Sequence, residues 1–137
     1  MTVIVTDNGF AKETLPAMFF AIDDLPANDA VVAINLPSDT QPEDLTDRVM
    51  RAQTIRVDFP SFSDGRGFTL ARLLRARGFA GRLRAAGHVI ADQYAMARRA
   101  GFDEVEIDDD LARRQPESQW RARADWQSHD YQNRLRG

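Results

Sequence analysis

The sequence contains no cysteine and almost no lysine. Lys12 stands alone among 18 basic residues in a chain of 137, and all the others are arginines. The absence of cysteine excludes thiolate nucleophiles, cysteine-ligated iron–sulfur clusters, zinc knuckles and disulfides. The chain therefore has no residue of its own that could hold a thiolate-bound redox centre.

Long apolar runs are missing as well. No stretch approaches the ~20 apolar residues of a membrane-spanning helix, and the start MTVIVTDNGF lacks the basic and apolar regions of a targeting peptide. The sequence pI is about 5.3, and no helix-turn-helix or RNP pattern accompanies the arginines. We therefore expect a cytoplasmic protein that has neither a membrane nor a nucleic acid as its partner.

The charges that are present are unevenly distributed. The net charge is −3, but residues 66–102 hold eight arginines and a single acid, Asp92. Arginine forks bind carboxylate, phosphate or sulfate groups with two hydrogen bonds. A set of solvated outer helix faces would give the same pattern. The arginine-rich middle is thus either an anion-binding region or an ordinary charged surface.

The length and the ordinary hydrophobic share of 43% suit one domain over residues 1–137. Its middle part, 30–108, alternates short apolar strands with segments of helical periodicity, as βα units do. We predict strands at 31–36, 54–59, 82–86 and 104–107. Between them we predict helices at 42–52, 68–77 and 89–100.

This alternation predicts an α/β fold of consecutive βα units around a parallel sheet, either half-barrel-like or open. Residues 1–29 should form a β-hairpin around Asn8-Gly9, followed by a loop with at most one helical turn. Residues 109–137 should form a helical tail. The two edges of such a sheet need cover from the hairpin, from the tail or from a second copy, so a homodimer is expected.

The tail carries two tryptophans, Trp120 and Trp126, in a polar setting. Two large aromatic side chains in such a segment indicate a docking face. That face could contact the same chain or a partner.

Ligands of parallel α/β sheets gather at the carboxyl ends of the strands. Asp58 lies at the carboxyl end of one predicted strand, His88 follows the next, and Asp92 lies one helical turn beyond His88. A histidine near carboxylates suits proton transfer, and three such ligands would be the minimum for a catalytic metal. A structural histidine is the alternative, and we expect no bound metal.

A second candidate site is the loop Asp64-Gly65-Arg66-Gly67, which opens the predicted helix after the second strand. Two glycines around an arginine present backbone N–H groups at the positive end of a helix, and this favours an anion. Gln93 lies at the neighbouring strand end and completes this candidate site. The alternative is a tight turn in which Asp64 caps the helix and forms an ion pair with Arg66.

The stretch around this loop, FSDGRGFTLARLLR at 62–75, resembles a motif of a bacterial domain-of-unknown-function family numbered nine-three-four. The similarity continues through GRLRAAGHVIADQ at 81–93, RAGFD at 99–103 and the closing Tyr131-Gln132, so that it covers roughly residues 30–132. The resemblance implies an oxidoreductase of assimilatory sulfite reduction.

An oxidoreductase needs an electron carrier, but the sequence has no cysteine, no Rossmann glycine fingerprint and no haem-attachment motif. We therefore expect no intrinsic cofactor, so that redox chemistry would use a borrowed flavin or nicotinamide or belong to a partner. The first hypothesis is an accessory protein of sulfite reduction that binds a component of sulfite reductase or a small anion. The others are a small enzyme using Asp58, His88 and Asp92, and a structural dimer module.

Overall fold

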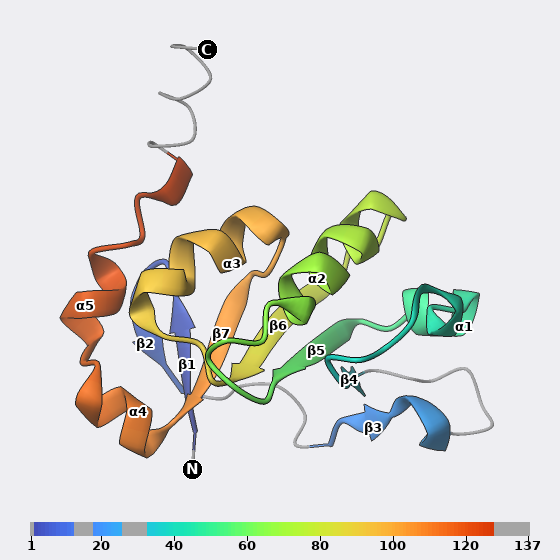
Figure 1. Ribbon diagram of the computed structural model, residues 1–137, viewed down its shortest axis with the longest axis horizontal. Helices are drawn as coiled ribbons and strands as arrows, with labels where there is room; N and C mark the ends of the chain where they lie inside the picture. Colours follow the sequence, from blue (N-terminus) through green and yellow to red (C-terminus); the bar gives the residue numbers. More distant parts are fainter. Residues whose placement is uncertain (1, 13–17, 26–32, 128–137) are drawn as a thin grey trace.

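The computed structural model describes residues 2–12, 18–25 and 33–127, and its centre is a mixed, mostly parallel sheet (Figure 1). The strand order across the sheet is β2-β1-β7-β6-β5-β4-β3. The strands from β3 to β7 are parallel and follow one another in chain order, which is the arrangement expected for consecutive βα units. The strands are β1 (Thr2–Thr6), β2 (Gly9–Ala11), β3 (Phe20–Ala21), β4 (Ala33–Leu36), β5 (Thr54–Phe59), β6 (Arg82–Gly87) and β7 (Glu104–Asp108).

The N-terminal hairpin covers one edge of the parallel part. Strand β1 pairs antiparallel with both β2 and β7, and Thr6 lies opposite Gly9 at the turn. The outer edge of β2 is covered as well, because the Phe10 backbone N–H donates a hydrogen bond to the Glu117 carboxylate at 2.8 Å. The predicted hairpin is confirmed, and this edge of the sheet has no need of a second copy.

Helices α2 and α3 lie side by side on one face of the sheet (Figure 1). Phe59 of β5, Phe68 of α2 and Phe102 before β7 pack there, with ring centroids 4.9 to 6.5 Å apart. The helices are α1 (Asp47–Met50), α2 (Arg66–Ala76), α3 (Tyr94–Ala100), α4 (Asp109–Arg114) and α5 (Glu117–Arg121), with 3₁₀ turns η1 (Ile22–Asp24), η2 (Pro42–Asp44) and η3 (Ala91–Gln93).

The prediction of one helix over 42–52 is wrong. The segment forms the 3₁₀ turn η2 and then the separate single-turn helix α1. Between them Leu45 leaves the helical region, with φ −85° and ψ 70°. Thr46 then starts a new helix, and its side chain accepts a hydrogen bond from the Val49 N–H at 3.4 Å. A capping residue inside the segment thus breaks the helix that its periodicity suggests.

The prediction of a loop over 14–29 is incomplete. Strand β3 adds to the free edge of β4 in parallel, with Phe20 opposite Ile34, and η1 supplies the expected single helical turn. The remainder, 14–17 and 26–29, lies outside the described residues, as do positions 31–32 of the predicted first parallel strand. A segment of this chain therefore covers the second sheet edge over a length of two residues.

The face of the sheet opposite α2 and α3 is polar. Arg84 of β6 is 1% exposed and donates to Glu104 at 2.6 Å and to Glu106 at 2.8 Å. Arg56 of β5 extends the network, since its Nε donates to the Asn35 side-chain oxygen at 2.8 Å. Charge-assisted hydrogen bonds thus link four neighbouring strands, from β4 to β7, where a fully wound α/β protein would place a second apolar layer.

The tail packs on its own chain as far as it is described. Trp120 of α5 is 1% exposed, and its indole N–H donates to the Gln115 carbonyl at 2.9 Å. Trp126 is partly buried under the Arg98 guanidinium, which lies 4.7 Å from the ring centroid. Both tryptophans therefore contact residues of the same chain. His129 and the Tyr131-Gln132 end lie outside the described residues.

Asp7, in the turn of the hairpin, forms hydrogen bonds with side chains of α3 and of the C-terminal tail. Its carboxylate accepts hydrogen bonds from the Tyr94 hydroxyl, from Arg98 at 3.1 and 3.2 Å and from the Trp126 indole at 3.4 Å. Partial burial raises the pKa of Asp7, but the hydrogen bonds from Tyr94 and Arg98 outweigh it and lower the pKa below the usual 3.8. Burial and the neighbouring carboxylate raise the pKa of the Tyr94 phenol.

This arrangement predicts an acid-sensitive contribution to stability. Because the pKa of Asp7 is lower in the folded state, its contribution is present above the unfolded pKa of about 3.9 and is lost as the pH falls through the folded value. Asp7→Asn should therefore lower the free energy of unfolding at pH 7 and flatten its decline between about pH 5 and pH 2. Urea titrations across this range measure both effects, and equal slopes for the two proteins would contradict the role of Asp7.

No helix within the described ranges is both long enough and apolar enough to cross a membrane.

Candidate functional site

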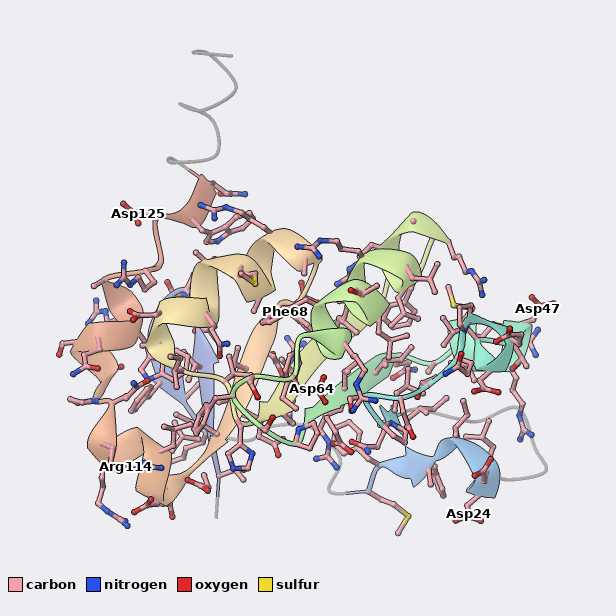
Figure 2. The ribbon with its side chains drawn as sticks, in the orientation of Figure 1. Asp24, Asp47, Asp64, Phe68, Arg114 and Asp125 are labelled. Atoms are coloured by element: carbon pink, nitrogen blue, oxygen red, sulfur yellow. The ribbon has the colours of Figure 1, made fainter. Side chains whose placement is uncertain are left out.

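The loop that follows β4 and one face of α2 line an open cavity at the carboxyl edge of the sheet. The cavity has a volume of about 260 Å³ and lies between the 38–42 segment and one face of α2. Figure 2 shows Asp64 in the loop that leads from β5 into α2, beside this region. The lining residues are Ser38, Asp39, Thr40, Gln41, Pro42, Arg66, Thr69, Leu70 and Leu73.

Arg66, the first residue of α2, is held along one side of its guanidinium group. Its Nε donates to Asp64 Oδ1 at 3.0 Å, and its Nη2 donates to Asp64 Oδ2 at 2.8 Å and to Ser38 Oγ at 3.1 Å. Nη1 has no hydrogen-bond partner in the part of the chain that the structure describes, and 60% of the side chain is exposed. Two N–H donors of a fixed fork are thus free at the mouth of the cavity.

Asp64 fixes the loop as well as the side chain. Its Oδ1 also accepts a hydrogen bond from the Arg66 backbone N–H at 3.1 Å. The Arg66 side chain, and after it the Arg66 backbone N–H, hold the pKa of Asp64 well below its usual range. Asp64 therefore stays ionised at neutral pH, and together with Ser38 it orients Arg66.

The two glycines of the loop have different roles. A Cβ at Gly67 would lie 2.4 Å from the Phe59 ring, so this position has no room for a side chain. A Cβ at Gly65 would meet nothing within 4 Å, and the backbone there has an ordinary φ of −89°. Packing therefore explains Gly67. Gly65 is the N-cap of α2, a position at which glycine is a favoured residue, and no neighbouring atom would meet a side chain there.

We expect Gly67→Ala to be destabilising by about 1–3 kcal/mol, because the added methyl group forces the Phe59 ring out of the aromatic cluster. Gly65→Ala, two residues earlier in the same loop, is the matched control and should change the free energy of unfolding by less than about 1 kcal/mol, because it alters only the N-cap of α2. Chemical denaturation of both variants checks this difference. Equal losses would show that the close approach of Gly67 to Phe59 does not constrain the fold.

Gln93 positions the loop from the neighbouring strand end. Its side-chain nitrogen donates to the Phe62 carbonyl at 3.1 Å, and its side-chain oxygen accepts from the Ile90 backbone N–H at 3.0 Å. Gln93 thus connects the segment after β6 to the segment that carries Asp64 and Arg66. In this structure its amide is committed to backbone groups and not to the cavity.

Asp39 gives the cavity a second charge. It is exposed, and its carboxylate has no hydrogen-bond or ion-pair partner among the described residues. Asp39 is close enough to Arg66 to raise the pKa of the guanidinium, after the larger effect of Asp64. Asp39 also lines an adjoining cavity of about 430 Å³, together with Asp23, Glu43 and Asp44.

The three candidates for proton transfer have separate partners. Asp58 accepts a hydrogen bond from the Asn35 side chain at 3.0 Å on the polar face of the sheet. The Nδ1 atom of His88 lies 3.2 Å from the Phe59 carbonyl, and Asp92 forms an exposed ion pair with Arg123 at 2.7 Å. No hydrogen bond or ion pair joins any two of the three candidates.

His88 lines a smaller cavity of about 140 Å³, which also borders Glu106 and Arg114. Its ring is perpendicular to that of Phe62, with centroids 5.0 Å apart. In the described ranges, no group of three or more histidine, aspartate or glutamate side chains is placed to hold a metal ion.

The arginine-rich middle contributes mainly to the fold. Arg75 donates to the carbonyls of Phe79, Gly81 and Gly101 and also pairs with Asp103. Arg98 holds Asp7, and Arg84 is buried on the polar face. Arg72 and Arg99 are the exposed arginines of this region that make no hydrogen bond or ion pair with a described residue. The sequence could not separate the structural arginines of α2 and α3 from the exposed ones, because their spacing along these two helices is alike.

The residues of the polar face were not among the candidates predicted from the sequence. Arg56, Arg84, Glu104 and Glu106 alternate with apolar residues in TIRVDF, RLRAAG and EVEID. Alternation with a period of two marks a strand that has one apolar and one polar face. This signal was available in the sequence and predicts helices on only one face of the sheet.

The fold and the site define a class of small α/β protein whose mostly parallel sheet bears helices on one face and a cavity at the carboxyl ends of its strands. Residues 33–137 match the family model described as a bacterial protein of unknown function, DUF934, and the chain belongs to that family. The chain has no significant match among curated proteins. It has none among solved structures either.

Proposed function

We propose that this protein is an accessory protein of assimilatory sulfite reduction that binds a small anionic group at Arg66. The observation that carries the proposal is the fork of Arg66, fixed along one side by Asp64 and Ser38 and free along the other. A fixed arginine loses little side-chain freedom on binding, so the free Nη1 side is prepared for an oxyanion or a carboxylate.

The position of Arg66 supports the same proposal. It begins an eleven-residue helix at the carboxyl edge of a parallel sheet, and the aligned peptide dipoles add positive potential at that end. Gly65, next to it, carries no side chain that would hinder an approaching ligand. At helix N-termini of this kind, backbone N–H groups and the positive end of the helix dipole favour the binding of anions.

In this proposal a partner protein supplies the electrons for the reduction. The chain has no cysteine to hold an iron–sulfur cluster or to form a redox disulfide. The hypothesis of a proton-transfer enzyme receives less support, since Asp58, His88 and Asp92 each bind a different group. A component of sulfite reductase is the partner that the proposal requires.

Deletion of the gene in its host tests this function. The deletion strain should grow on cysteine or sulfide and fail, or grow slowly, on sulfate or sulfite as its sulfur source. Wild-type protein and Arg72→Ala should restore growth, whereas Arg66→Ala should not, because Arg72 is an exposed arginine of the same helix outside the cavity. Growth of the deletion strain on sulfite at the normal rate would contradict the proposal.

A further inference from the structure

The cavity beside Arg66 carries charges of both signs, and this limits what can bind there. Asp64 neutralises part of the Arg66 charge, and Asp39 adds an unpaired carboxylate on the same lining. An inorganic anion bound at Arg66 would also lie near Asp39, so that repulsion from Asp39 weakens its binding without abolishing it. A ligand that carries both charges would satisfy each residue.

We infer that the cavity accepts a small zwitterion with an apolar side chain, that is, a ligand of the α-amino-acid class. This inference rests on the proposed function, because the anionic end of the ligand is the group bound at Arg66. The free Nη1 side of Arg66 receives the carboxylate of the ligand, and the Asp39 carboxylate receives its ammonium group.

The other lining residues fit the rest of such a ligand. Leu70 and Leu73, four and seven residues after Arg66, lie on the same face of α2, and Pro42 lies across the cavity from this face. Leu70 is 5% exposed and Leu73 is partly buried, so this part of the lining belongs to the apolar core. An apolar side chain of the ligand would extend the core surface, which an inorganic anion cannot do.

The acidic side of the cavity continues beyond Asp39. The adjoining cavity of about 430 Å³ shares Asp39 and adds Asp23, Glu43 and Asp44 to its lining. These carboxylates increase the negative potential at the Asp39 end, whereas Arg66 and the start of α2 make the opposite end positive. The site is therefore polarised along its length, and a dipolar ligand has a preferred orientation in it.

Calorimetric titration of the full chain with L-leucine tests the inference, with three matched ligands beside it. N-acetyl-L-leucine lacks the ammonium group, L-leucinamide lacks the carboxylate, and glycine lacks the apolar side chain. L-leucine should bind, and each of the other three should bind at least about tenfold more weakly.

Asp39→Asn supplies the decisive variant. Asp39 is exposed and its carboxylate makes no hydrogen bond or ion pair with a described residue, while its backbone carbonyl accepts from the Gln41 side chain. The substitution leaves that backbone bond in place, so the variant should fold and melt like the wild type. It should bind L-leucine and N-acetyl-L-leucine with equal affinity and should bind sulfate no more weakly than the wild type. Leu73→Ser should weaken L-leucine binding and leave sulfate binding unchanged.

The outcomes separate the inference from the function it rests on. Equal binding of L-leucine and N-acetyl-L-leucine by the wild type overturns the zwitterion and leaves anion binding at Arg66 standing. Binding of sulfate without any binding of L-leucine also overturns the zwitterion and leaves anion binding at Arg66 standing. If Arg66→Ala changes the binding of neither ligand, both the inference and the proposed function are overturned.

Discussion

Replacing Arg84 with methionine should destabilise the protein by about 3–5 kcal/mol, enough to unfold a marginally stable domain. Arg84 is 1% exposed and donates to Glu104 at 2.6 Å and to Glu106 at 2.8 Å. Methionine fills similar space but leaves Glu104, itself 4% exposed, without its closest cation. The cost arises from the buried carboxylate that remains and not from the value of the ion pair itself.

Arg82→Met is the matched control for Arg84→Met. Arg82 lies on the same strand, and its Nε is 3.5 Å from the same Glu104, but its side chain is 46% exposed. Its removal should cost no more than about 1 kcal/mol. The double variant Arg84→Met with Glu104→Gln should recover part of the loss, because no buried charge remains at position 104. Equal losses for the two methionine variants in urea unfolding would contradict this interpretation.

Trp120→Ala should also cost about 3–5 kcal/mol, through a cavity in the core. The indole of Trp120 is 1% exposed, packs edge-on against Tyr94 with ring centroids 6.2 Å apart, and donates to the Gln115 carbonyl. Its removal leaves that carbonyl without the indole donor and loosens α5 from the hairpin. Thermal and urea unfolding both measure this loss.

Trp126→Ala is the control that shows whether the stability loss of Trp120→Ala arises from the burial of Trp120. Trp126 is only partly buried, and its main contacts are the Arg98 guanidinium and Asp7. We expect a loss of about 1 kcal/mol for this variant, since less apolar surface leaves water when it folds. If Trp120→Ala proves as mild as Trp126→Ala, the indole of Trp120 is not part of the core.

The βα core could be predicted because its local signals agree with one another. Gly78 and Gly101 end α2 and α3 with φ values of 97° and 118°, a conformation that favours glycine. Strand β5 has the predicted bounds, and β6 and β7 each extend one residue further. Periodicity, helix stops and strand length all point to the same architecture here, as expected for a minimally frustrated segment.

Of the two mispredicted segments, one depends on a pairing with a strand far away in the sequence, and the other depends on a local side-chain cap. Strand β3 is two residues long and exists because it adds to β4, which no local pattern records. In the 42–52 segment the apolar periodicity favours one helix, but the cap at Thr46 starts a second one. Local propensity is a weak guide wherever tertiary pairing or a side-chain cap decides the outcome.

The sequence offered an anion-binding loop and an ion-paired turn as alternatives for residues 64–67. The structure shows the ion pair of the turn, in which Asp64 binds one side of Arg66, and Nη1 has no partner among the described residues. Anion binding at this loop stays a prediction. Ser38 and Asp39 come from the loop after β4 and enter the site only through the fold. No spacing within the loop could have indicated them.

The central claim is that Arg66 binds a small anionic group in the cavity between α2 and the 38–42 segment. Amide chemical shifts of the isotopically labelled protein, followed during titration with sulfite, test it most directly. We predict saturable chemical-shift changes that are largest at Gly65, Arg66 and Gly67 and smaller at Ser38. These changes should be absent in Arg66→Ala and retained in Arg72→Ala. Changes centred on His88 instead, or an unchanged spectrum at millimolar sulfite, would contradict the claim.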